Sequence, residues 1–158
     1  MKLHLDWSHP IPLKDGTEQN LIYAIDEHKL PDAAGVYIFG RQWGKKKFEA
    51  LYVGKADNIH HRIVRQQLKN LPLMLGLRNA KTGARIALAG RFVSRPGQQA
   101  KRCLPVIERA LIRYFLSEGH ELVNKQGTRL RHHEIASDGK HPKRFFPRLM
   151  YLERARGL

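Results

Sequence analysis

Cysteine is nearly absent from this 158-residue sequence, which contains only Cys103. A single cysteine excludes an internal disulfide framework and a zinc module built from several cysteines. Long apolar runs are absent as well, since no stretch approaches the ~20 residues of a membrane span, and the N-terminal MKLHLDWSHPIPLKDG lacks the continuous apolar segment of a signal peptide. We therefore expect a cytoplasmic protein that has no membrane partner.

Acidic residues are scarce relative to basic ones. The chain has 29 lysines and arginines against 14 aspartates and glutamates, a formal net charge of +15. Residues 1–40 hold 3 basic and 6 acidic side chains, residues 41–124 hold 17 and 5, and residues 125–158 hold 9 and 3. A basic body is typical of a protein that binds a polyanion, and nucleic acid is the first candidate. A merely solvated basic surface is the alternative.

The length and the hydrophobic content of 42% indicate one domain over residues 1–158. Alternating β-branched and aromatic residues predict strands in GVYIFG, FEALYVG and RIALAGRFVS, the first two joined by a basic turn. Apolar periodicity predicts helices over residues 18–31, about 58–70 and about 99–117. The segment 71–84 is predicted to be irregular. We expect an N-terminal helical arm at 1–30 and a basic C-terminal extension at 128–158 that combines loops, a strand and a short final helix.

The turn between the second strand and the next helix, YVGKADNIHHR, has features of an anion site. Asp57 or Asn58 is a suitable N-cap, so free N–H groups and the positive end of the helix dipole are expected to face the turn. Lys55 and Arg62 could converge there on one phosphate. Taken singly, each could be an ordinary surface cation.

Glu108 interrupts an apolar helical face that it shares with Leu104, Leu111, Ile112 and Phe115. A buried carboxylate without a partner is costly, so Glu108 must meet a cation, a hydrogen-bond network or a metal. A structural ion pair with an arginine is one interpretation. The other is a hard divalent cation held by one carboxylate, waters and substrate oxygens.

Tyr37 and Tyr52 lie on the two predicted strands of the hairpin. Taken alone they would be core aromatics. Together with Lys55, Arg62 and Glu108 they are an inventory for phosphodiester hydrolysis, which needs a proton acceptor, cations for the transition state and a metal ligand.

With these residues the sequence resembles the GIY-YIG nucleases. Gly35-Val36-Tyr37 and Tyr52-Val53-Gly54 resemble the two motifs that name the family, with Gly35 and Gly54 as the motif glycines. The resemblance covers about residues 31–127, the GIY-YIG-like catalytic core, and continues through Lys55, Asp57-Asn58-Ile59, Arg62, the helix segment Ile107-Glu108-Arg109-Ala110-Leu111-Ile112 and Asn124.

The resemblance implies a mixed α/β (α+β) fold with a small three-stranded antiparallel sheet flanked by helices. It implies a divalent-metal-dependent endonuclease that hydrolyses DNA, with both tyrosines facing one cleft, Glu108 holding one Mg²⁺ or Mn²⁺ and Arg62 stabilising the phosphorane. Asn124 would brace the cleft. Tyr37 is the first choice for accepting the proton of the attacking water and Tyr52 the second, and nearby Lys55 is expected to lower the pKa of the phenol.

Two intervals are longer than is usual in the family: the 14 residues between Tyr37 and Tyr52, and the stretch from Glu108 to Asn124. The first includes a basic turn tip, which suggests an added nucleic-acid contact through Lys45, Lys46 and Lys47. The pairs His60-His61 and His132-His133 are predicted to be surface residues, because no third partner has metal-ligand spacing.

Three functions are compatible with these residues. A DNA endonuclease is favoured, a catalytically inactive module that binds DNA or RNA is the alternative, and a basic structural protein is the third interpretation. With one cysteine, a cysteine-rich targeting domain is excluded. Targeting is then expected from the loop 41–49, the segment 71–84, the basic tail, homodimerisation or a protein partner. The preferred DNA structure and the biological role stay open.

Overall fold

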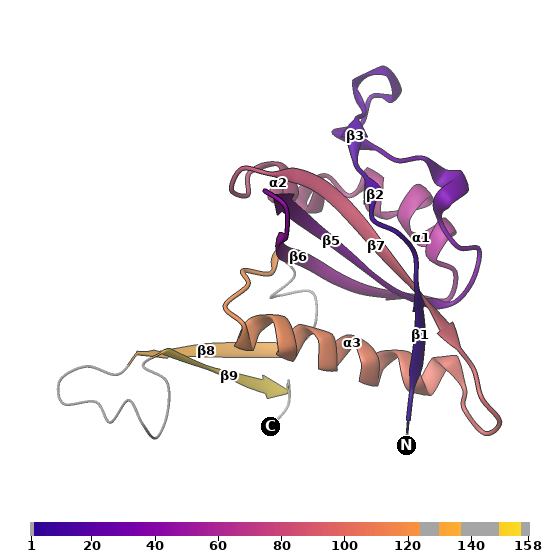
Figure 1. The fold of residues 1–158 in the computed structure, drawn as a ribbon, viewed down its shortest axis with the longest axis vertical. Coiled ribbons are helices and arrows are strands. Elements are labelled where there is room, and N and C mark those ends of the chain that lie inside the picture. The colour runs from indigo at the N-terminus through magenta and orange to yellow at the C-terminus, as the bar shows by residue number, and fades with distance from the viewer. Residues whose placement is uncertain (1, 124–129, 137–148, 156–158) are drawn as a thin grey trace.

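This computed structural model describes residues 2–123, 130–136 and 149–155, with side chains described over 2–123. Antiparallel sheets pack against three α-helices in the described residues, a mixed α+β fold (Figure 1). The strands are β1 (His4–Trp7), β2 (Ile11–Pro12), β3 (Lys14–Asp15), β4 (Tyr23–Ala24), β5 (Gly35–Trp43), β6 (Lys47–Ala56), β7 (Ala84–Val93), β8 (Leu130–Ala136) and β9 (Leu149–Ala155). The helices are α1 (Ile59–Arg65), α2 (Leu71–Arg78) and α3 (Ala100–Ser117), with 3-10 turns η1 (Thr17–Gln19), η2 (Glu27–Lys29) and η3 (Gln67–Lys69).

The main sheet has five strands rather than the three that were expected. Its order is β1-β7-β5-β6, and β2 also pairs with β7. The three predicted strands form the consecutive part β7-β5-β6, with β6 at the edge. The N-terminal residues add β1 and β2 along β7, with Leu5 opposite Phe92 and Ile11 opposite Ala87. These additions pair backbone groups of β7 that would otherwise form an open edge. Both added strands are short, and Pro10 precedes β2 while Pro12 belongs to it, so neither strand has a recognisable period-2 pattern.

The helix predicted over residues 18–31 is not formed, so the N-terminal arm is not helical. The segment contains only the short turns η1 and η2 on either side of β4. Asn20, at the end of η1, has a left-handed φ of 58°, and the Asp26 side chain accepts from the backbone N–H of His28 at the start of η2. Ile22 and Ile25 pack against the core without a regular helix.

The two faces of the main sheet carry different residues of the hairpin β5–β6. Tyr37 and Phe39 point into the core that α1, η3 and α2 cover, whereas Ile38 and Val53 point into a core built on α3. Figure 1 shows α3 lying along one side of the sheet and α1 and α2 on the other. Alternation along β6 therefore sends Tyr52 and Val53 to opposite faces.

The helix predictions were right in part. The long helix was expected at about 99–117 and forms as α3 at Ala100–Ser117. The helix expected over 58–70 divides into α1 and η3. The segment 71–84, expected to be irregular, contains α2, which begins where the Asn70 side chain accepts from the N–H of Leu73 at 3.1 Å.

The C-terminal residues form the antiparallel pair β8–β9 where they are described. The short final helix is thus wrong, since Leu149–Ala155 is a strand. Within the described part of the chain, none of the helices has the length and apolar character needed to span a membrane.

Candidate active site

The motif glycines Gly35 and Gly54 sit where no side chain fits. A Cβ at Gly54 would overlap the ring and hydroxyl of Tyr37, which pairs with it across the hairpin. A Cβ at Gly35 would collide with the carbonyl oxygen of Gly90 on β7. The two glycines therefore let the tyrosine ring and the neighbouring strand pack directly on the backbone.

Tyr37 and Tyr52 lie on the same face of the sheet. Their ring centroids are 6.1 Å apart in a stacked arrangement. The Gln67 side-chain amide donates to the Tyr37 hydroxyl and, at 3.3 Å, to the Tyr52 hydroxyl. Tyr37 is only 1% exposed, whereas Tyr52 is partly buried. Both hydroxyl oxygens thus accept from the same buried amide.

The pKa of Tyr37 is raised, which is opposite to the expected direction. Burial is the main cause, and the neighbouring Tyr52 adds to it, while the Gln67 hydrogen bond and the Arg62 charge act against it. Lys55 does not lower this pKa as predicted. The reason is geometric: Lys55 alternates with Gly54 along β6 and so stands on the opposite face from the two rings.

A pocket of about 390 Å³ lies between the β6–α1 turn and the beginning of α3. Lys55, Asp57 and Arg62 line one side, and Lys101 and Pro105 line the other. Lys55 and Lys101 are exposed and Arg62 is partly buried. Three cations from a strand and two helices therefore converge on one concave space, as an anion site requires.

Glu108 follows Leu104, which lines this pocket, by one helical turn and is partly buried. Burial raises the pKa of its carboxyl, and the Lys55 charge, a hydrogen bond from the Lys55 backbone N–H and the charges of Arg62 and Arg109 oppose that rise. In the described part of the chain it forms no ion pair with an arginine. The Glu108 carboxyl therefore accepts one backbone hydrogen bond and lies in the electric field of several nearby cations.

The N-terminus of α1 is closed to anions, contrary to expectation. The N–H of Ile59 donates to the Ala33 carbonyl at 2.9 Å and that of His60 to the Pro31 carbonyl at 3.1 Å. The N–H of His61 donates to the Asn58 side chain at 2.9 Å, which confirms Asn58 as the N-cap. Any phosphate here would be bound by side-chain cations rather than by the helix end.

Lys45, Lys46 and Lys47 are exposed at the turn of the hairpin, as predicted. They lie at the opposite end of β6 from Lys55, roughly 25 Å away along an extended strand. The structure therefore does not bring them to the pocket. His60 is partly buried and His61 exposed.

Three further predicted positions lie outside the part of the chain whose side chains are described. Asn124 falls outside the described residues, and so do the side chains of His132 and His133, which belong to β8.

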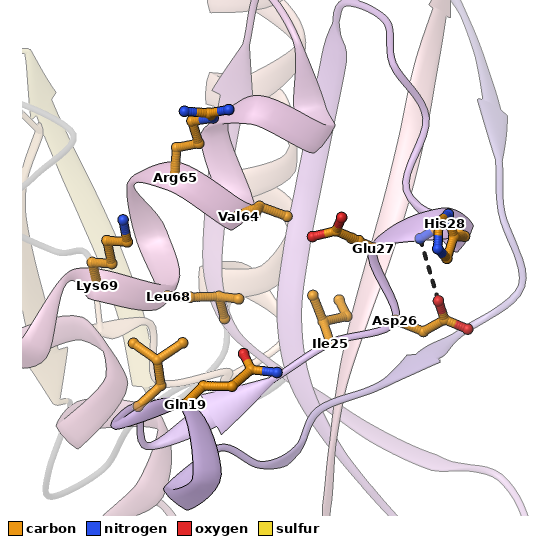
Figure 2. Close-up of a pocket in the computed structure, with 10 residues that line it drawn as sticks. Gln19, Ile25, Asp26, Glu27, His28, Val64, Arg65, Leu68 and Lys69 are labelled. Carbon is orange, nitrogen blue, oxygen red and sulfur yellow. Dashed lines mark hydrogen bonds between the residues drawn. The ribbon is translucent and has the colours of Figure 1, made fainter.

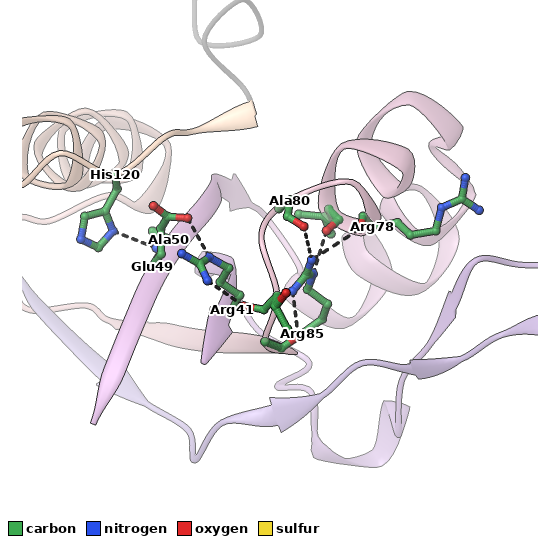
Figure 3. A network of polar contacts seen from close by, with 10 residues as sticks. Arg41, Glu49, Ala50, Arg78, Ala80, Arg85 and His120 are labelled. Carbon is green, nitrogen blue, oxygen red and sulfur yellow. Dashed lines mark hydrogen bonds and ion pairs between the residues drawn. The ribbon is translucent and has the colours of Figure 1, made fainter. Parts of the chain in front are cut away.

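The turn end of the hairpin is held by its own polar network (Figure 3). Arg41, which is 7% exposed, pairs with Glu49 at 2.9 Å and donates to the Thr82 carbonyl at 2.6 Å. On the edge strand β6, the N–H of Ala50 donates to Nδ1 of His120 at 2.8 Å. These contacts join β5 to the loop before β7 through Thr82, and β6 to the segment after α3 through His120.

The donor set limits which metal the site could take. Among the residues that the structure describes, no cluster of three histidines, cysteines or carboxylates could hold an ion alone. Glu108 offers one carboxylate beside a cationic pocket. That chemistry fits a hard ion such as Mg²⁺, which keeps several waters and takes other ligands from a phosphate, and not a closed structural site.

Gln67 and Lys101 are the neighbours that sequence reasoning missed. Gln67 continues the line of Ile59 and Ile63 at intervals of four residues, so its place on the inner helical face was readable as a buried amide. No local signal marks Lys101, because only the packing of α3 brings it to Lys55.

Comparison of the chain with protein-family models, with curated proteins and with solved structures finds no match. The functional interpretation therefore depends on the site's own residues.

Proposed function

We propose that the chain is a divalent-metal-dependent endonuclease that hydrolyses DNA phosphodiester bonds, as the GIY-YIG nucleases it resembles do. The observation that carries the proposal is the position of Arg62. Its charge acts on both Tyr37 and Glu108, and its side chain lines the pocket together with Lys55. The Arg62 guanidinium is therefore near the tyrosine face of the sheet, near the Glu108 carboxyl and at the wall of the cationic pocket.

In this proposal the pocket binds the phosphate that is cut. Lys55 and Lys101 position it as point charges, and the planar fork of Arg62 stabilises the charge that grows on its oxygens. Glu108 would hold the divalent ion, which when bound polarises a phosphoryl oxygen. Because β6 is the edge strand of the sheet, a phosphate at this edge can be approached from both faces.

Tyr52 is the better candidate for the proton acceptor. Tyr37 is buried, hydrogen-bonded to Gln67 and has a raised pKa, so it is a poor base at neutral pH. Tyr52 lies on the edge strand, is partly exposed and shares Gln67 only through a longer bond. Tyr37 would then orient Gln67, which in turn orients the Tyr52 hydroxyl.

The test is nicking of supercoiled plasmid in Mg²⁺ or Mn²⁺, with EDTA as the control. We expect nicking with metal and none with EDTA. Tyr52→Phe should lower the rate by about 100-fold or more, the range of general-base loss. Tyr37→Phe, its matched partner, should change thermal stability more than rate. Intact plasmid with both metals contradicts the proposal.

The alternative is a module that binds nucleic acid without cutting it. The observation that favours it is the buried Tyr37 hydroxyl, which already accepts a hydrogen bond from Gln67. Binding of labelled DNA and RNA in EDTA that weakens with salt, combined with no cleavage in metal, identifies this module. Homodimerisation or a targeting partner stays a prediction in either case.

A further inference from the structure

A second pocket, of about 580 Å³, lies between η2 and the α1–η3 segment (Figure 2). Its floor is apolar and includes Ile25, Val64 and Leu68. Figure 2 shows Glu27 on the η2 side, and Arg65 and Lys69 on the helical side. A volume of this size suits a small organic group, and the lining is apolar in the middle with opposite charges on two walls.

The charged groups on these walls are available to a ligand. Asp26 is engaged, because its carboxylate accepts from the His28 N–H at 3.3 Å. Within the described residues, no ion pair holds Glu27, Arg65 or Lys69, and all three are exposed. A matching ligand has an anionic group at one end, a flat apolar body and hydrogen-bond donors at the other end. A nucleotide has these three features.

The pocket is connected to the candidate active site by a line of cations. Arg62 and Arg65 are three residues apart on α1 and so project from the same side of the helix. Lys69, at the end of η3, lies with Arg65 on the helical wall of the pocket (Figure 2). A DNA strand whose phosphate is held at Arg62 can therefore continue along Arg65 with its next nucleotide over this pocket.

We infer that the pocket holds one unpaired nucleotide of a DNA substrate, next to the phosphate that is cut. The base stacks on Ile25, Val64 and Leu68, its phosphate meets Arg65 and Lys69, and its amino group donates to the Glu27 carboxylate. Cytosine presents such an amino donor, whereas uracil presents a carbonyl oxygen that the carboxylate repels. This inference rests on the proposed nuclease function and names its substrate class: DNA with an unpaired nucleotide.

The experiment measures binding in EDTA, so that it needs no cleavage. Three labelled duplexes are compared by fluorescence anisotropy: one fully paired, one with a single unpaired deoxycytidine and one with an unpaired deoxyuridine. The wild-type protein should bind the deoxycytidine bulge about tenfold more tightly than either of the others. Glu27→Gln should remove the difference between the two bulges, because glutamine can donate as well as accept.

Arg65→Ala and two control variants, one matched to Arg65 and one to Glu27, separate binding in the pocket from a general effect of charge. Arg65→Ala should weaken binding of the deoxycytidine-bulged duplex more than of the paired one. Arg102→Ala, an exposed arginine of α3, should weaken all three alike, and Glu121→Gln should leave the discrimination intact. Melting temperatures confirm that each variant is folded.

The outcomes distinguish this inference from the proposed function. Equal affinity of the wild-type protein for all three duplexes overturns the inference, and so does discrimination that survives Glu27→Gln. A deoxycytidine preference without plasmid cleavage in metal upholds the pocket and contradicts the nuclease. Plasmid cleavage in metal without any bulge preference upholds the nuclease and contradicts the pocket.

Discussion

Charged side chains have internal partners at one end of the β5–β6 hairpin and face a pocket at the other end. At the turn end, Arg41 is bonded to Glu49 and to the Thr82 carbonyl, and His120 accepts from the Ala50 N–H. At the other end, Lys55 and Arg62 line a pocket, and within the described residues neither forms an ion pair.

This contrast separates groups that hold the fold from groups that are free to hold a ligand. Removing one member of a buried ion pair destabilises the fold, because it strands the charge of the partner. A charge that faces a pocket without a partner adds little to stability and keeps its full field for an anion. Variants at the pocket end should therefore change function, whereas variants within the turn-end network should change stability.

Glu108→Gln should have the largest effect. Glutamine keeps the size and can still accept from the Lys55 N–H, but it lacks the charge that a hard divalent ion needs. We expect DNA binding to be equal or tighter and plasmid cleavage in Mg²⁺ to be abolished. Burial raises the pKa of Glu108, so the fold disfavours its charged form and the melting temperature near neutral pH should not fall.

The stability measurement decides between the two roles of Glu108. If Glu108 were the partner of a buried arginine, the same change would lower stability by roughly 3–5 kcal/mol, and activity per folded molecule would persist. A stable variant that still cuts would remove Glu108 from the mechanism.

Arg62→Ala should lower the cleavage rate by about 100-fold, the usual cost of losing one donor to a charged transition state. Affinity for DNA should change only a few-fold, since many other cations remain. Single-turnover cleavage and anisotropy measure the two effects separately. Arg102→Ala is the control for a generic loss of one positive charge, and equal losses of rate and affinity would assign Arg62 to backbone binding alone.

The sequence was sufficient for the parts that depend on local pattern. The hairpin, β7, α3 and a cap at Asp57 or Asn58 follow from periodicity and capping. That Tyr37 and Tyr52 share a face depends on the hairpin register, which pairs Tyr37 with Gly54. The closed N-terminus of α1 could not be foreseen, because the carbonyls of Pro31 and Ala33 reach it through tertiary packing. The position of Lys55 on the far face from Tyr37 also depends on the register of the hairpin.

The three lysines at the turn of the β5–β6 hairpin are predicted to contact the DNA backbone and not to take part in cleavage. Neutralising Lys45, Lys46 and Lys47 together should weaken DNA binding about tenfold and reduce the slope of log affinity against log salt by about 2 to 3 if all three contact phosphates. Cleavage at saturating DNA should survive. Neutralising the exposed Lys2, Lys14 and Lys29 removes the same charge elsewhere. An identical slope change in both triple variants would mean that the hairpin tip has no specific contact.

His120 should give the smallest effect, and it concerns stability alone. Its Nδ1 accepts from the Ala50 N–H at 2.8 Å, which requires that Nδ1 carries no proton. Burial lowers the pKa of His120 below its usual 6.5, and the nearby Glu49 and Glu118 carboxylates act against that shift. The folded state therefore favours neutral histidine, and protonation removes the acceptor for an edge-strand N–H.

The sign of the pH effect follows from this lowered pKa. The stabilisation is complete above the unfolded pKa near 6.5, and it is lost as the pH falls through that value and then through the lower folded pKa. We expect a loss of about 1 kcal/mol, the value of one neutral hydrogen bond. His120→Asn keeps an acceptor oxygen and cannot titrate. The melting temperatures of wild type and variant are compared from pH 8 to pH 5, and their difference removes the contribution of the other histidines, which both proteins share. A difference that stays constant with pH would show that His120 does not couple protonation to the edge strand.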